Sequence, residues 1–230
     1  MDAKVDAMSD AKATVAAAPK PPVFDPAFQQ KFAELIAWRR DVRRFRPDRV
    51  DPALIEHLLD LAQLAPSVGN SQPWRFVSVD SPAMRTKVRN NFLRCNETAA
   101  GAYQGERAAL YARLKLEGID VAPRQFALFC DRATEQGQGV GRQTMPEALD
   151  YSVVAMIETF WLAARALGLG VGWVSILDPQ TVTVDLDVPP DWKFIGYLCV
   201  GWPVEEHVDP ELVRHNWQDR TRAGREVLQR

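Results

Sequence analysis

Residues 149–176 read LDYSVVAMIETFWLAARALGLGVGWVSI. Apolar side chains surround most of the first part of this stretch, so we expect a helix from Leu149 to Leu167, buried in a domain or shared between subunits. Gly168 stands where a glycine commonly ends a helix. Residues 171–176 follow as a predicted strand. One dominant apolar helix among mixed helices and strands predicts an α+β layered domain.

The chain on both sides of this stretch continues the mixture of helices and strands. Asp51 with Pro52, and likewise Asp25 with Pro26, are typical of helix starts. The other predicted elements are helices over 26–38 and from 51 to before Pro66, a helical region over 82–118 broken near 100–101, and strands over 74–79, 125–130 and 194–200. The charged tail from Gly201 is expected to lie on another surface or to stay mobile.

Length and composition limit the class of protein. The 230 residues suit one domain, which we place at 25–230 behind a disordered arm over 1–24. A net charge of -2 indicates no nucleic acid partner, and no apolar run is long enough to cross a membrane. Three cysteines without a CxxC pair fit a cytoplasmic protein, and no cluster of metal-ligating residues is present in the sequence.

Two polar segments are candidates for a binding site. The run Arg39-Arg40-Asp41-Val42-Arg43 either binds a phosphate through paired hydrogen bonds or forms a solvated basic face. The loop 65–74 presents hydroxyls, carboxamides and backbone amides that suit the edge of a flat heterocycle, although an ordinary turn has the same composition. Its candidate residues are Pro66, Ser67, Val68, Gly69, Asn70 and Gln72.

A third candidate segment is rich in glycine. Residues 168–176 carry three glycines on the way into a strand that ends near Ser175. Small residues allow a backbone to approach a ligand ring closely, whereas a helix cap followed by a tight turn is the simpler interpretation. The segment precedes a strand, so it is not a dinucleotide-binding fingerprint, which follows one.

In their order along the chain, the three segments resemble those of FMN-dependent nitroreductases. The closer resemblance is to the BluB-type 5,6-dimethylbenzimidazole synthases, a group within that superfamily, and it runs from about Arg39 to about Arg220. Its marks are Arg39-Arg40-Asp41 with Asp in place of the usual Ser, Gly105-Glu106-Arg107, 114–119, Ala122-Pro123, Cys130-Asp131-Arg132, 161–166 and 170–176.

This resemblance implies a nitroreductase-like α+β fold with a central mixed sheet flanked by helices in an intertwined homodimer. It also implies that reduced FMN and O2 are substrates, that the flavin is broken into 5,6-dimethylbenzimidazole and erythrose 4-phosphate, and that NAD(P)H acts only through a separate flavin reductase. Asp41 and Ser175 are then the catalytic residues, and a lid is expected over 99–119. The FMN-binding residues would be Arg39, Arg40, Asp41, Val42, Arg43, Pro66, Ser67, Val68, Gly69, Asn70, Gln72, Trp173, Val174, Ser175 and Arg220.

Within this assignment the arginines and Arg220 bind the phosphate, while Asn70 and Gln72 face the flavin ring from the other subunit. Asp41 is a candidate base for a proton on the first ribityl carbon. Neighbouring arginines lower the pKa of such a carboxyl group and burial raises it, and the sequence leaves both effects open. Two other functions also remain open: an NAD(P)H-dependent nitroreductase or cobalt-corrinoid reductase that keeps its flavin, and a non-catalytic flavin-binding protein.

Overall fold

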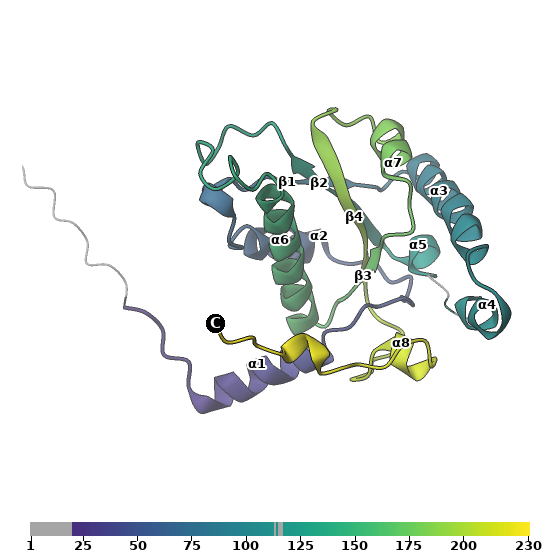
Figure 1. Ribbon diagram of the computed structural model, residues 1–230, viewed down its shortest axis with the longest axis horizontal. Coiled ribbons are helices and arrows are strands. Elements are labelled where there is room, and N and C mark those ends of the chain that lie inside the picture. Colours follow the sequence, from purple (N-terminus) through teal and green to yellow (C-terminus); the bar gives the residue numbers. More distant parts are fainter. Residues whose placement is uncertain (1–19, 113, 115–116) are drawn as a thin grey trace, which may run out of the picture.

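The computed structural model describes residues 20–112, 114 and 117–230, so positions 1–19 of the predicted arm over 1–24 and three positions of the predicted lid lie outside it. Figure 1 shows helices on both sides of a central sheet. The elements are α1 Pro26–Trp38, α2 Pro52–Ala62, η1 Val68–Asn70, β1 Trp74–Ser78, α3 Pro82–Ala100, α4 Gly105–Tyr111, α5 Gly118–Val121, β2 Arg124–Asp131, α6 Ala148–Ala166, β3 Gly170–Val174, α7 Pro179–Asp185, β4 Trp192–Gly201, α8 Glu211–Arg214 and η2 Ala223–Arg225.

The helix starts follow the capping pattern of the sequence. The Asp25 carboxylate accepts a hydrogen bond from the Phe28 amide at 2.7 Å, and Asp51 accepts one from Ala53 at 2.9 Å. A proline follows each cap, where the missing N–H costs nothing. The predicted helices at 26–38 and from 51 are therefore confirmed. Helix α7 begins in the same way at Asp178 but was not predicted.

The sheet has the strand order β1-β2-β4-β3, and all three pairings are antiparallel. Our expectation of a mixed sheet is therefore wrong for the described strands. A single parallel bridge, Asp41 to Val171, lies at the β3 edge. The apolar β4 sequence reflects cover on both faces, which an antiparallel sheet between two helical layers also has.

Two apolar clusters pack on the two faces of this sheet. One joins α2 and α6 to the sheet and includes Leu58, Met156 and Phe160, none of which is exposed. The other joins α3 and α7 to the opposite face around Phe129 and Tyr197. Helix α6 stands upright to the left of the sheet in Figure 1, and Gly168 follows it with a φ of +80°. The predicted buried helix and its glycine stop are thus confirmed.

A buried polar network fixes the chain where the predicted lid returns to the sheet. The Tyr197 hydroxyl donates to the Gln125 Oε1 atom at 2.6 Å, and the Gln125 Nε2 atom donates to the Ile119 carbonyl at 3.0 Å. Arg85 adds hydrogen bonds to the carbonyls of Ala122 and Pro123. Every donor in this network has an acceptor, so it fixes one end of the segment firmly.

The tail after β4 lies on the segment 39–46 of the same chain. The Arg46 amide donates to the Trp202 carbonyl at 2.8 Å, and the Val204 amide donates to the Arg44 carbonyl at 3.1 Å. Over the described ranges, we find no helix with the length and apolar character needed to cross a bilayer.

Candidate functional site

The segment 39–43 enters the site along the edge of β3. The Val42 amide donates to the Val171 carbonyl at 3.0 Å, beside the bridge from Asp41. A Cβ atom on Gly172 would collide with the Val42 carbonyl oxygen, and one on Gly170 would lie 2.8 Å from the Val42 side chain. The glycines therefore make room for Val42, not for a ligand ring, and this part of our expectation is corrected.

The Asp41 carboxylate is fixed by both of its oxygens. Oδ1 accepts a hydrogen bond from the Trp173 amide at 2.8 Å, and Oδ2 lies 3.4 Å from the Arg43 Nε atom. Burial, the largest effect, raises the pKa of Asp41 above its ordinary value even though these two donors oppose it. The side chain is still 36% exposed, so the carboxylate is both oriented and reachable.

A small chamber lies on the α5 side of Asp41. Its volume is about 10 Å³, close to the space that one water molecule needs. Cys199 lies in its wall, and burial raises the pKa of this thiol, so it stays neutral beside the carboxylate. The other lining residues are Asp41, Val42, Arg43, Gly118, Ile119, Gly172, Trp173 and Val174.

A second cavity, of about 180 Å³, is surrounded by arginines. Four arginines line it together with Asp41 and Glu211, and one of the four, Arg220, is far from the others in sequence: Arg39, Arg40, Arg43 and Arg220. Arg220 also helps to lower the pKa of Arg40, after burial, because two positive charges lie close together. The structure thus brings together the four arginines that the sequence proposed.

These arginines differ in how far the chain itself satisfies them. Arg40 donates to the backbone carbonyls of Ala37, Arg39 and Val208, so it also holds the tail in place. Arg39 lies 4.9 Å from the Trp161 ring, and its buried Nε atom forms an ion pair with the Glu158 carboxylate at 3.6 Å. A cavity lined by several guanidinium groups suits a bound anion.

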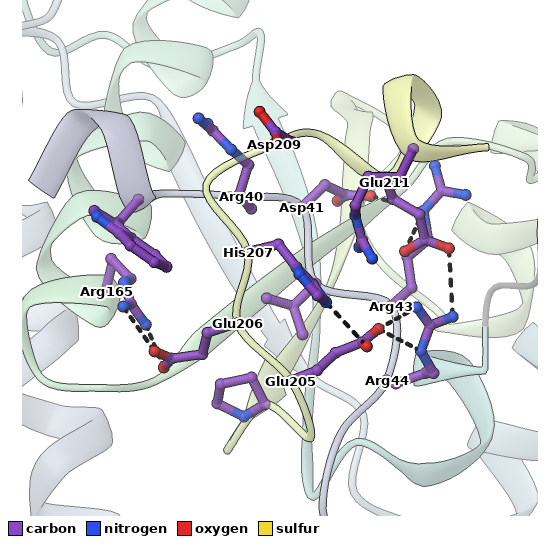
Figure 2. A pocket seen from close by; sticks show the side chains of 14 residues that line it. Arg40, Asp41, Arg43, Arg44, Arg165, Glu205, Glu206, His207, Asp209 and Glu211 are labelled. Atoms are coloured by element: carbon purple, nitrogen blue, oxygen red, sulfur yellow. Dashed lines mark hydrogen bonds and ion pairs between the residues drawn. The ribbon is translucent and has the colours of Figure 1, made fainter. Parts of the chain in front are cut away.

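Sequence reasoning missed a set of acidic residues from the tail. Figure 2 shows Glu205 and Glu211 beside Arg43 and Arg44. The Glu211 carboxylate is buried and lies 3.3 Å from Arg44 and 4.0 Å from Arg43. Its negative charge is one of the causes that raise the pKa of Asp41. The excess of arginine over 39–46 was a signal that acidic partners had to come from elsewhere.

Ser175 lies immediately beyond the end of β3 and is exposed. It follows Trp173, the Asp41 partner, by two residues, so the two predicted catalytic residues belong to the same sheet edge. The predicted strand 171–176 is two residues too long at its end. Ser175 is therefore free of the β3 pairing with β4, which ends at Val174.

The polar loop 66–72 has a strained backbone that its neighbours stabilise. Asn70 and Gln72 have φ angles of +53° and +43°, which are uncommon for residues other than glycine. The Val68 amide donates to the Ser152 hydroxyl of α6 at 3.0 Å. Gln136 donates to the Asn70 carbonyl at 2.9 Å and to the Gln72 side-chain oxygen at 3.2 Å.

The loop and the arginine segment attach to opposite ends of α6. Ser152 holds the loop, whereas the Trp161 indole donates to the Arg40 carbonyl at 3.2 Å. Trp161 follows Ser152 by nine positions of the helix, a rise of about 13 Å. The three cavities that Asp41 lines contain no residue of 66–72. Within one chain, then, the structure does not bring the two predicted parts of the site together.

Comparisons with known proteins agree with this geometry. A family model described as the nitroreductase family matches residues 36–202. A 5,6-dimethylbenzimidazole synthase of Rhodospirillum rubrum is 59% identical over 86% of this chain and 94% of its own length. One of Rhodobacter capsulatus is 48% identical over 85% of this chain and 95% of its own length.

Among solved structures, an oxidized iodotyrosine deiodinase bound to FMN and 3-iodo-L-tyrosine is similar to the chain in fold. The TM-score is 0.65 at 22% identity, and the match covers 76% of this chain and 91% of the other. At this identity the likeness concerns the arrangement of helices and strands.

Proposed function

The chain belongs to the nitroreductase family and has its α+β fold, and on that premise we propose that it is a 5,6-dimethylbenzimidazole synthase. Relatives at 59% and 48% identity carry that name over nearly their whole length. The observation that carries the proposal is Asp41, a reachable carboxylate held by the Trp173 amide beside an arginine-lined cavity.

The substrate in this proposal is reduced FMN, and the arginine cavity fits its phosphate. Guanidinium groups match phosphate oxygens in charge and geometry, and four arginines line this cavity. Arg220 enters the cavity from the tail, so the phosphate is gripped from two distant parts of the chain. The reduced flavin and O2 supply the chemistry, which yields 5,6-dimethylbenzimidazole and erythrose 4-phosphate.

Asp41 acts in this scheme as the base near the ribityl chain. Of the two opposing effects on its pKa, burial outweighs the arginines, so its conjugate acid is weaker than an ordinary aspartic acid. A carboxylate with a raised pKa accepts a proton more readily at neutral pH. Arg43 and the Trp173 amide keep it aimed while it does so. Ser175 presents its hydroxyl to the ring edge from the end of β3.

The flavin ring requires residues from a second copy of the chain in this proposal. The loop with Asn70 and Gln72 is attached about 13 Å along α6 from Arg40, so a loop from a partner subunit completes the site. The single chain leaves apolar side chains exposed that a homodimer would cover. They include Phe28, Phe32 and Ile36 of α1 and Tyr151 and Val154 of α6, each at least 43% exposed.

Residues 25–230 form one domain in this proposal, and the segment 99–119 is its lid. Gly118 and Ile119 line the chamber beside Asp41, which supports a lid whose end lies near the carboxylate. NAD(P)H serves only a separate flavin reductase that supplies the reduced FMN. The three cysteines are free, in keeping with a reducing cytoplasm.

The test is to incubate the protein with excess FMN, a separate flavin reductase, NADH and air, and to quantify dimethylbenzimidazole. We expect product from the wild-type chain and a loss of about 10²–10⁴-fold in Asp41→Asn, with FMN binding retained. Asp48→Asn, an exposed change in the same segment, is the matched control. Intact FMN with NADH consumed by the protein alone would instead indicate a nitroreductase, and no turnover would indicate a flavin-binding protein.

A further inference from the structure

The lid helix α4 docks on the tail through one aromatic cluster, which comprises Tyr103, Tyr111 and Trp217. The Tyr103 and Tyr111 rings stack at 4.9 Å, and Trp217 meets Tyr103 edge-on at 5.3 Å. Arg107 lies 4.9 Å over the Trp217 ring and donates to the Trp217 carbonyl at 2.7 Å. Arg107 belongs to the Gly-Glu-Arg motif that the proposed chemistry leaves unused.

Helix α4 depends on these contacts. It spans Gly105–Tyr111, has no side-chain cap at its start and buries none of its residues. So short a helix is unstable in isolation, so tertiary contacts must hold it. The Tyr111 hydroxyl adds a hydrogen bond to Asn96 of α3 at 2.8 Å. Release of Trp217 would remove the contacts of α4 with the tail and leave the Tyr111–Asn96 hydrogen bond to tie the helix to α3.

Trp217 is also tied to the arginine cavity. Its amide donates to the Leu212 carbonyl at 2.8 Å. Leu212 and Arg220 both line the cavity, and Arg220 follows Trp217 by three residues. Arg220 is exposed and approaches Arg40, whose positive charge repels it. An anion between these two arginines would remove that repulsion and hold the tail in place.

From this chain of contacts we propose that Arg107 and Trp217 are positioning residues that couple the lid to the phosphate of the flavin. Phosphate binding to Arg220 orders the tail, the ordered tail presents Trp217, and Arg107 docks α4 on it. Flavin that carries a phosphate therefore closes the lid, whereas riboflavin leaves it open. By linkage, the docked lid strengthens phosphate binding by the same factor. This inference rests on the proposed function for the identity of the ligand.

The test compares FMN with riboflavin in the absence of reductant. We expect FMN, but not riboflavin, to slow amide hydrogen exchange over 103–112 in the wild-type protein. In Arg107→Met we expect that protection to be lost, FMN to bind roughly tenfold more weakly, and riboflavin affinity to change less than twofold. Arg225→Met, an exposed change in the same tail, is the matched control.

A second variant separates coupling from damage to the fold. Trp217→Leu should weaken FMN binding as Arg107→Met does. The double variant should bind FMN no more weakly than either single variant, because both substitutions remove the same Arg107–Trp217 contact. Equal protection by the two flavins, or equal loss of both affinities in Arg107→Met, would overturn the proposal. All readouts are binding and exchange, so coupling without dimethylbenzimidazole formation would reject the proposed reaction and leave the coupling intact.

Discussion

The two ends of α6 are built in different ways. At the Arg40 end, the side chains carry charge and most find partners within the chain: Asp41 with Arg43, Arg44 with Glu211, Arg40 with backbone carbonyls. At the Ser152 end, the loop 66–72 carries no charge and presents carboxamides on a strained backbone. Observed strain of this kind is a reason to suspect function. In the proposed function, one end serves proton transfer and anion binding, and the other contacts an uncharged ring.

The largest expected effect tests whether the two ends meet only between subunits. Two variants are prepared: one carries Asp41→Asn, and the other carries both Asn70→Ala and Gln72→Ala. Each variant on its own should make little dimethylbenzimidazole. Co-expressed, they should form mixed dimers with one intact site, and random pairing restores roughly a quarter of wild-type activity. The measurement is product per protomer in the purified mixture. If the mixture made no more product than the separate variants, both ends would belong to the site of a single chain.

A glycine at each end gives the next comparison. Gly172→Ala should lower product formation by about 10²-fold, because its Cβ would push Val42 off β3 and displace Asp41. Gly69→Ala adds a side chain at a φ of +57° and should weaken flavin binding more than the chemical step.

The two glycine effects are separated by FMN affinity and single-turnover product yield. Gly224→Ala, where the added atom meets nothing within 4 Å, should change neither quantity. If Gly172→Ala lowered FMN affinity and product yield in equal proportion, the Asp41 end would contribute to flavin binding as well as to the chemical step.

Ser175→Gly should have a smaller effect at the chemical end. We expect about a tenfold loss of product yield with little change in FMN affinity, as for one lost hydrogen bond in a reaction step. Ser175→Thr keeps the hydroxyl and should recover part of the yield. A change in thermal stability alone would mean that Ser175 only ends the strand.

The smallest effect concerns pH. Asp41 must be ionised to accept a proton, and its pKa is raised by burial, so activity should fall on the acid side at a higher pH than an ordinary aspartate, about 3.9, would give. The effect on stability has the opposite sign. A raised pKa means that the folded protein binds the Asp41 proton more tightly than the unfolded chain does, so the contribution of Asp41 to the free energy of unfolding falls as pH rises. A pH profile of single-turnover yield, beside a denaturation series, measures both.

Several features followed from the sequence alone because their causes are local. Caps at Asp25 and Asp51 fixed helix starts, and Gly168 ended the long helix, through contacts within a few residues. The apolar circumference of 149–167 required burial wherever that helix went. The resemblance pointed to Asp41 and the arginines because they are contiguous in the sequence.

What only the tertiary structure decided depends on residues far apart in the chain. Strand directions, the use of Gly172 by Val42, and the arrival of Glu211 at the segment 39–44 arise from long-range packing, which no local pattern encodes. The balance of effects on the Asp41 pKa was likewise open until burial could be compared with the two donors. Local chemistry determined which groups are present, and packing over the whole fold determined which of them meet.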